Sequence, residues 1–123
     1  MFAADEYGQI SVNGVKNTFG SSDYVTKFAQ TVSSAGTTSN LKVTIELYKD
    51  ISTSYLVSPS YVYSFVELKL NGHTFKTTSA NAYKLSGLNI DGGGGTIDFN
   101  KSSLNDIIFY FNTCSCCICC ISC

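Results

Sequence analysis

A stretch of strict alternation at 41–48 constrains the fold of this chain more than any other feature. Four apolar residues alternate there with four polar or aromatic ones, Leu41, Val43, Ile45 and Leu47 against Lys42, Thr44, Glu46 and Tyr48. Successive side chains of a strand point to opposite faces, so this pattern predicts a strand with one face in the core and the other in water. Such a strand must bury its apolar face against a second layer.

Two Asn-Gly pairs mark the best-defined turns. Asn13-Gly14 separates 9–12 from 15–19, and Asn71-Gly72 separates 61–70 from 73–77. Because Asn-Gly readily adopts the positive φ angles of a type I′ turn, we predict a β-hairpin at each place. The alternation within 61–70 predicts one face of Val62, Ser64, Val66, Leu68 and Leu70, and an opposite face of Tyr61, Tyr63, Phe65, Glu67 and Lys69.

The remaining segments are less regular. Helical spacing of apolar residues after the capping candidates Ser21, Ser22 and Asp23 predicts the only helix at 23–34. The continuous apolar run 107–111 is typical of a central strand covered on both faces. Asp91 to Gly95 is expected to be a flexible loop. Weaker strand patterns occur at 51–57, 82–85, 96–100 and 106–111.

Together these elements predict an all-β fold, mainly antiparallel, arranged as a sandwich or flattened barrel. We expect seven to nine short strands with one short helix near 23–34. The β-rich domain should span 1–113 and be followed by a cysteine-rich tail at 114–123, and we find no internal repeat. The residues expected in the core are Val43, Ile45, Val66, Leu68 and Ile108.

The charge pattern argues against a nucleic-acid partner. All eight positive side chains are lysines, none is arginine, and the formal net charge is -1. Bidentate recognition of phosphates and bases depends on the arginine guanidinium, so its absence, with a pI near 5.6, makes nucleic acid an improbable partner.

No pattern of catalytic residues is evident, so we expect no enzyme and no cofactor. The single histidine, His73, follows an Asn-Gly turn without a nucleophile at a recognisable spacing. The glycine-rich segment 91–98 lacks the Lys and Ser or Thr of a phosphate-binding loop. A weak Ca²⁺ site at Asp91 and Asp98 is a minor alternative to a loop without a ligand.

An aromatic face is the first candidate for a binding surface. If the core faces are assigned correctly, Tyr48, Tyr61, Tyr63 and Phe65 point outward, and such a face suits another protein or a sugar ring. The alternative is that this face is the inside of the second sheet.

All six cysteines lie in the last ten residues, so the body folds without a disulfide of its own. The tail admits a thiolate cluster for Cu(I) or Zn²⁺, S-acylation at a membrane, an apolar segment packed on this or a neighbouring chain, or disulfides in an oxidising compartment. These candidate metal or acylation residues are Cys114, Cys116, Cys117, Cys119, Cys120 and Cys123.

The function that these features favour is a non-enzymatic structural or interaction domain. It would associate with itself or another protein through strand edges, the aromatic face and the apolar C-terminus. The alternatives are a carbohydrate-binding, lectin-like module and a metal-binding or S-acylated protein, with membrane contact only if the tail is acylated. The location is cytoplasmic if Met1 is the true start and extracellular if a leader was removed.

Overall fold

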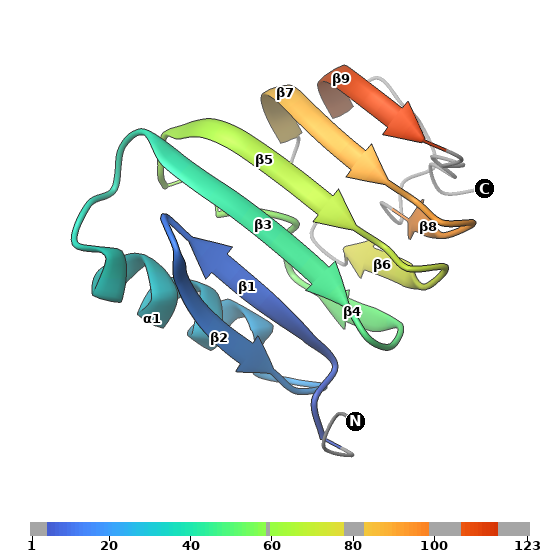
Figure 1. Ribbon diagram of the computed structural model, residues 1–123, viewed down its shortest axis with the longest axis horizontal. Coiled ribbons are helices and arrows are strands. Elements are labelled where there is room, and N and C mark those ends of the chain that lie inside the picture. The colour runs from blue at the N-terminus through green and yellow to red at the C-terminus, as the bar shows by residue number, and fades with distance from the viewer. Residues whose placement is uncertain (1–4, 59, 78–82, 99–106, 116–123) are drawn as a thin grey trace.

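The computed structural model describes residues 5–58, 60–77, 83–98 and 107–115, and this part of the chain is mostly strands with one short helix (Figure 1). This agrees with the predicted β-rich class. In chain order the elements are β1 (Gly8–Val12), β2 (Val15–Phe19), α1 (Tyr24–Ala35), β3 (Leu41–Leu47), β4 (Ile51–Thr53), β5 (Tyr63–Lys69), β6 (Thr74–Thr77), β7 (Tyr83–Asp91), β8 (Thr96–Asp98) and β9 (Ile107–Ser115).

The first predicted hairpin is confirmed. Strands β1 and β2 pair antiparallel from Val12↔Val15 outward, and the turn residues Asn13 and Gly14 have φ angles of 50° and 86°. Both angles lie in the left-handed region that a type I′ turn requires. On its other side β1 pairs antiparallel with β3, so the hairpin forms one end of a larger sheet.

The predicted helix is also confirmed, shifted by one residue. Asp23 is its N-cap by position but makes no side-chain capping bond, because its Oδ1 accepts a hydrogen bond from the Gly20 N–H instead (2.6 Å). The helix ends at Gly36, whose φ of 79° is the left-handed conformation common just after a helix. Its buried side chains, Tyr24, Phe28, Thr31 and Val32, recur every three to four residues and form one face.

The second predicted hairpin is wrong, although its turn has the expected conformation. Asn71 and Gly72 do have positive φ angles, of 51° and 79°. The turn nevertheless carries the chain from one sheet to the other, because β5 and β6 belong to different sheets. The turn is hydrogen-bonded to the ends of the two neighbouring strands. Asn71 Nδ2 donates to Leu47 O at the end of β3 (2.9 Å), and Gly72 N donates to Gly92 O just after β7 (3.0 Å).

This connection repeats, and it builds the fold as a series of coils. Strands β3, β5, β7 and β9 lie side by side in a six-stranded sheet of order β2-β1-β3-β5-β7-β9, while β4, β6 and β8 form a three-stranded sheet. Each coil therefore adds one strand to each sheet, as in a β-solenoid. Of the pairings in the described residues, those of β1 with β2 and β3 are antiparallel and the other five are parallel. The prediction of a mainly antiparallel fold is wrong, and no barrel closes in the described ranges.

A repeat that the sequence analysis missed underlies these coils. Parallel pairing aligns Val43 with Val66 and Val66 with Leu88, and in the other sheet aligns Ile51 with Phe75 and Phe75 with Ile97. Strand β9 is the last strand of the sheet order rather than the central strand predicted from its apolar run.

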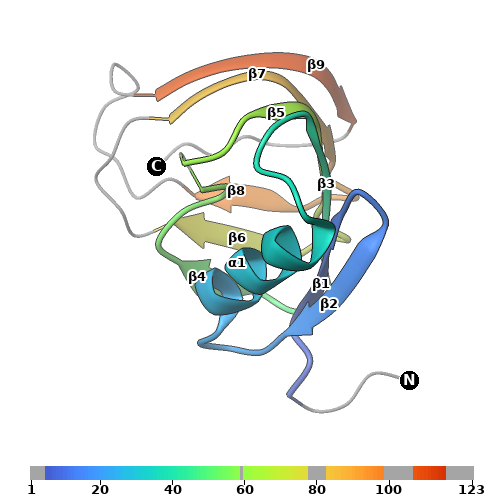
Figure 2. The same ribbon diagram turned by 90° about the vertical axis from the view of Figure 1, so that its left-hand side faces the viewer.

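The two sheets face each other across one core (Figure 2). Helix α1 continues the layer of β4, β6 and β8 and covers the inner face of β1 and β2 (Figure 2). Tyr24 joins the layers: its ring meets Phe19 and Phe75 edge-on, at centroid distances of 4.9 and 5.4 Å, and its hydroxyl donates to Leu56 O.

The predicted core is confirmed where side chains are described. Val43, Ile45 and Leu68 are 0% exposed and Val66 is 1% exposed. The fifth candidate, the Ile108 side chain, lies outside the described residues.

The glycine-rich segment is a packed turn between β7 and β8. Gly95 N donates to Gly92 O (2.8 Å), and Thr96 N donates to His73 O on the preceding turn (3.1 Å). A Cβ at Gly95 would lie 2.6 Å from both His73 O and Leu70 Cβ. Contact with the preceding coil therefore requires glycine at position 95. Close packing, rather than flexibility or a ligand, explains this member of the glycine-rich segment.

Candidate functional site

The outward side of the six-stranded sheet is polar, and we call it the outer face. It consists of the side chains that alternate with the buried ones, namely Lys16 and Thr18 on β2, Gln9 and Ser11 on β1, Lys42, Thr44 and Glu46 on β3, Phe65, Glu67 and Lys69 on β5, and Asn89 and Asp91 on β7. The alternation of β3 predicts its three members correctly, and the alternation of 61–70 predicts that Phe65, Glu67 and Lys69 share one face. The others could not be assembled from sequence, because nothing in it shows which strands are neighbours.

Part of this face is hollowed. A depression of about 290 Å³, which we call the outer hollow, extends over four adjacent strands from β2 to β5. Its lining contains no aromatic or aliphatic side chain and consists of Gln9, Ser11, Lys16, Thr44, Glu46 and Lys69.

The strand register fixes how these side chains are arranged. Ser11 lies opposite Thr44, and Gln9 lies opposite Glu46, so β1 and β3 provide a floor of two rows. Lys16 continues the first row on β2, and Lys69 continues the second on β5. The two lysines therefore stand at diagonal corners of the floor.

The charged side chains of the hollow differ in whether another side chain contacts them. Asn71 Nδ2 donates to Glu46 Oε2 (3.2 Å), which orients the carboxylate from the turn after β5. Within the described part of the chain, neither Lys16 nor Lys69 forms an ion pair. The lining carries two ammonium groups and one carboxylate, so it favours an anionic ligand.

The predicted aromatic face is largely dispersed. Tyr61 and Tyr63 are partly buried and pack against the core, whereas Phe65 is 40% exposed and lies on the outer face. The cause is a bulge at Ser64: Leu41 pairs with Tyr63, but the next residue, Lys42, pairs with Phe65. One extra residue in a strand reverses its alternation, so Tyr63 points inward and Val62, predicted to be inside, is 62% exposed.

The two inward tyrosines have structural contacts. The ring of Tyr61 stacks on Phe28 with a centroid distance of 6.3 Å and an angle of 9°. The Tyr63 hydroxyl donates to Ser58 O, and burial, followed by the nearby Tyr55 and Tyr61, raises the pKa of Tyr63 above its ordinary value of 10.0. Tyr63 therefore stays protonated as part of the core edge.

Tyr48, the remaining aromatic candidate, follows β3 and is partly buried. Burial raises its pKa, and the carboxylates of Glu46 and Glu6 add to the rise. Tyr48 comes just after the last residue of β3, whereas Phe65 pairs with Lys42 near the start of that strand, so the two belong to opposite ends of the sheet.

The cysteines fall mostly outside the described residues. Cys114 lies in β9, where its backbone is in register with Ile90. Cys116, Cys117, Cys119, Cys120 and Cys123 lie outside the described residues. In the described part of the chain, no three His, Cys, Asp or Glu side chains gather as a metal site would require. None of the helices in the described ranges has the length and apolar character needed to cross a bilayer.

The histidine has a role in the stacked turns. His73 Nδ1 lies 3.4 Å from Asp50 Oδ1, and the same carboxylate oxygen accepts a hydrogen bond from Thr74 N (2.9 Å). Asp50 thereby ties the turn after β3 to the turn after β5, a structural use of both side chains.

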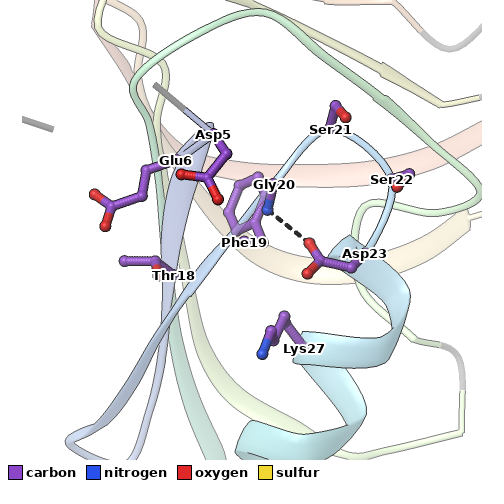
Figure 3. A pocket seen from close by; sticks show the side chains of 9 residues that line it. All are labelled: Asp5, Glu6, Thr18, Phe19, Gly20, Ser21, Ser22, Asp23 and Lys27. Atoms are coloured by element: carbon purple, nitrogen blue, oxygen red, sulfur yellow. Dashed lines mark hydrogen bonds between the residues drawn. The ribbon is translucent and has the colours of Figure 1, made fainter. Parts of the chain in front are cut away.

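A second pocket, of about 400 Å³, lies where α1 begins (Figure 3). Asp5 and Glu6 lie on one side of it, and Asp23 and Lys27 on the other (Figure 3). The Asp23 carboxylate is already engaged with the Gly20 N–H. This hydrogen bond accounts for how the chain enters the helix.

The chain matches none of the protein-family models, curated proteins or solved structures with which it was compared. Function therefore has to be inferred from its own side chains and their geometry.

Proposed function

We propose that this chain is a non-enzymatic interaction domain that binds its partner across the outer face of the six-stranded sheet. The observation that carries this proposal is the outer hollow, where polar side chains from four strands converge and two lysines lack an ionic partner in the described residues. Polar groups placed on a rigid sheet can bind without first being ordered, which lowers the entropic cost of association.

The scaffold supports such a role. The opposite face of β1 and β3, which form the floor of the hollow, is fully buried, with Ile10, Val43 and Ile45 all 0% exposed. Side chains on the outer face are therefore anchored by a backbone that the core holds in place. Solenoids use extended surfaces of this kind for binding.

The first partner that we propose is a second copy of this chain, which would join at the open edge of the sheet, beside the outer face rather than across it. In the described residues β2 pairs only with β1, and an open strand edge is a template for pairing with another chain. Association at this edge would continue the sheet and bring two outer faces into one surface. Phe65, the exposed apolar side chain of the outer face, lies at the far end of β5 from the hollow.

Sedimentation velocity under reducing conditions tests this arrangement. We expect a dimer to form between about 5 and 100 µM, and Thr18→Lys to weaken it, because a second lysine on β2 beside Lys16 would oppose pairing at this edge more strongly. Thr26→Lys, the same change at an exposed position of α1, is the control. A monomer at all concentrations, or equal effects of the two substitutions, would exclude association at β2.

Carbohydrate binding is the second candidate, and the outer hollow is what favours it. Its hydroxyl, amide and carboxylate groups suit the hydroxyl groups of a sugar. Tyr61 and Tyr63 support this candidate less, since their rings pack against the core. A glycan array with wild-type protein and Thr44→Val, which removes one hydroxyl from the hollow, provides the test.

The tail hypotheses of metal binding and S-acylation remain separate proposals, since five of the six cysteines lie outside the described residues. Intact-mass measurement of the natural protein distinguishes bound metal, acyl chains, disulfides and free thiols.

A further inference from the structure

We infer that the outer hollow binds an acidic saccharide, with the sugar hydroxyls on its floor and the carboxylates at its lysines. This inference rests on the carbohydrate-binding candidate and specifies the ligand class. It does not depend on self-association at β2.

The floor provides the contacts that sugar hydroxyls use. Ser11 and Thr44 can each donate and accept, Gln9 can do both through its amide, and Glu46 can accept two or more hydrogen bonds. These four side chains form two adjacent rows, since Ser11 is paired with Thr44 and Gln9 with Glu46. Neighbouring strands are about 4.8 Å apart, which places both rows within reach of one ligand.

The lysines determine the charge of the ligand. Lys16 stands beside Ser11 at one corner, and Lys69 stands beside Glu46 at the opposite corner. Three strand spacings separate β2 from β5, about 14 Å, so the two ammonium groups suit successive acidic units of a chain better than one small anion. Glu46 and Asp91 lie on the strands at either side of Lys69, yet neither Lys16 nor Lys69 forms an ion pair in the described residues.

The absence of rings from the lining strengthens the case for an acidic ligand. A neutral sugar gains affinity by stacking on aromatic side chains, and none of the six lining residues is aromatic. Affinity for a sugar at this site must therefore come from charge rather than from stacking. The volume of about 290 Å³ lies just below the usual range of ligand sites, which suits a shallow contact rather than an enclosed pocket.

The test is an NMR titration of the full-length, ¹⁵N-labelled chain in reductant. The probes are an α-1,4-linked trisaccharide of galacturonic acid, the neutral trisaccharide maltotriose, and acetate at the same carboxylate concentration. We expect the acidic trisaccharide to shift the amides of β1 and β3 around the hollow, and to bind less tightly as salt is raised.

Matched lysine variants locate the carboxylate contacts. Lys16→Gln and Lys69→Gln should each weaken the acidic trisaccharide by up to about 5-fold, the range of a surface ion pair. Lys76→Gln makes the same change on β6, in the three-stranded sheet on the other side of the core, and should leave binding unchanged.

Each other outcome overturns a defined part of the inference. Equal binding of maltotriose would remove the acidic ligand and leave the carbohydrate candidate standing. Equal shifts with acetate would remove the sugar. No shift at the hollow with any probe would overturn the site and the carbohydrate candidate together, while self-association, measured by sedimentation, would be unaffected.

Discussion

Substitution of Gly95 tests whether the coils of this fold stack as tightly as the hydrogen bonds indicate. A Cβ at Gly95 would lie 2.6 Å from His73 O and 2.6 Å from the Cβ of Leu70. The first is a backbone atom and the second belongs to a fully buried side chain, so neither can turn aside. At the neighbouring Gly94, by contrast, an added Cβ would meet nothing within 4 Å.

The magnitude follows from the bonds that must yield. Relieving the contact at Gly95 requires the turn to move by several tenths of an ångström. That movement separates Gly95 N from Gly92 O and Thr96 N from His73 O, now 2.8 and 3.1 Å apart. Each such bond contributes about 0.5–1.5 kcal/mol, so Gly95→Asn should lower the free energy of unfolding by about 1–3 kcal/mol.

Gly94→Asn is the matched control. Gly94 has a φ of +88°, and asparagine tolerates the left-handed region better than other side chains. We expect it to lower the free energy of unfolding by about 1 kcal/mol or less, the cost of the positive φ angle alone, because an added Cβ meets no atom there. Equilibrium unfolding in urea, followed by far-UV circular dichroism, measures both variants. Equal, small losses would show that the segment is the flexible loop predicted from sequence, and the stacked-turn interpretation would be refuted.

Three further predictions test the core, the buried tyrosine and the tail. Leu68→Ala should lower the free energy of unfolding in urea by about 2–5 kcal/mol, because Leu68 is 0% exposed. Glu67→Ala, the neighbouring control, should lower it by about 0.5 kcal/mol or less. The reverse order would mean that the faces of β5 are misassigned. The pKa of Tyr63 is raised in the folded state, so its contribution to stability is complete below about pH 10 and is lost as the pH rises further. Tyr63→Phe should flatten that decline, and an unchanged profile would contradict it. Removing metal with a chelator in reductant should leave the melting temperature unchanged, because every residue of the described core cluster lies between Ile10 and Ile97, outside the cysteine-rich tail. Unfolding on chelation would contradict this prediction.

Local pattern predicted local structure well. The alternation around Ile45 identifies the buried side of β3, and the apolar spacing after Asp23 identifies α1 to within one residue. Both signals depend on side-chain periodicity, which the sequence contains directly. The Asn71-Gly72 pair also has the φ angles expected of it.

What failed was the pairing of elements. An Asn-Gly turn specifies that the chain reverses locally, not which strand receives it afterwards. Here Gly72 N bonds to Gly92 O on the next coil, and Asn71 bonds to Leu47 O on the previous one. Those partners are 20 residues ahead in the sequence and 24 residues behind, so hairpin chemistry alone could not identify a turn between two sheets.

The candidate site was missed for the same reason, because it also depends on how strands pair. The bulge at Ser64 shows that one residue is enough to change which side chains are exposed. A single unpaired residue in β5 moved Tyr63 to the core and left Phe65 outside, which dispersed the aromatic surface that simple alternation predicts. The outer hollow, in contrast, brings together residues that are far apart in the sequence. Lys16 and Lys69 are far apart in sequence and have no common pattern, but the antiparallel hairpin at one side and the parallel coil at the other bring them to two corners of one floor. A surface of this kind is a property of strand order, and strand order here is set by which apolar faces can be buried together rather than by any motif.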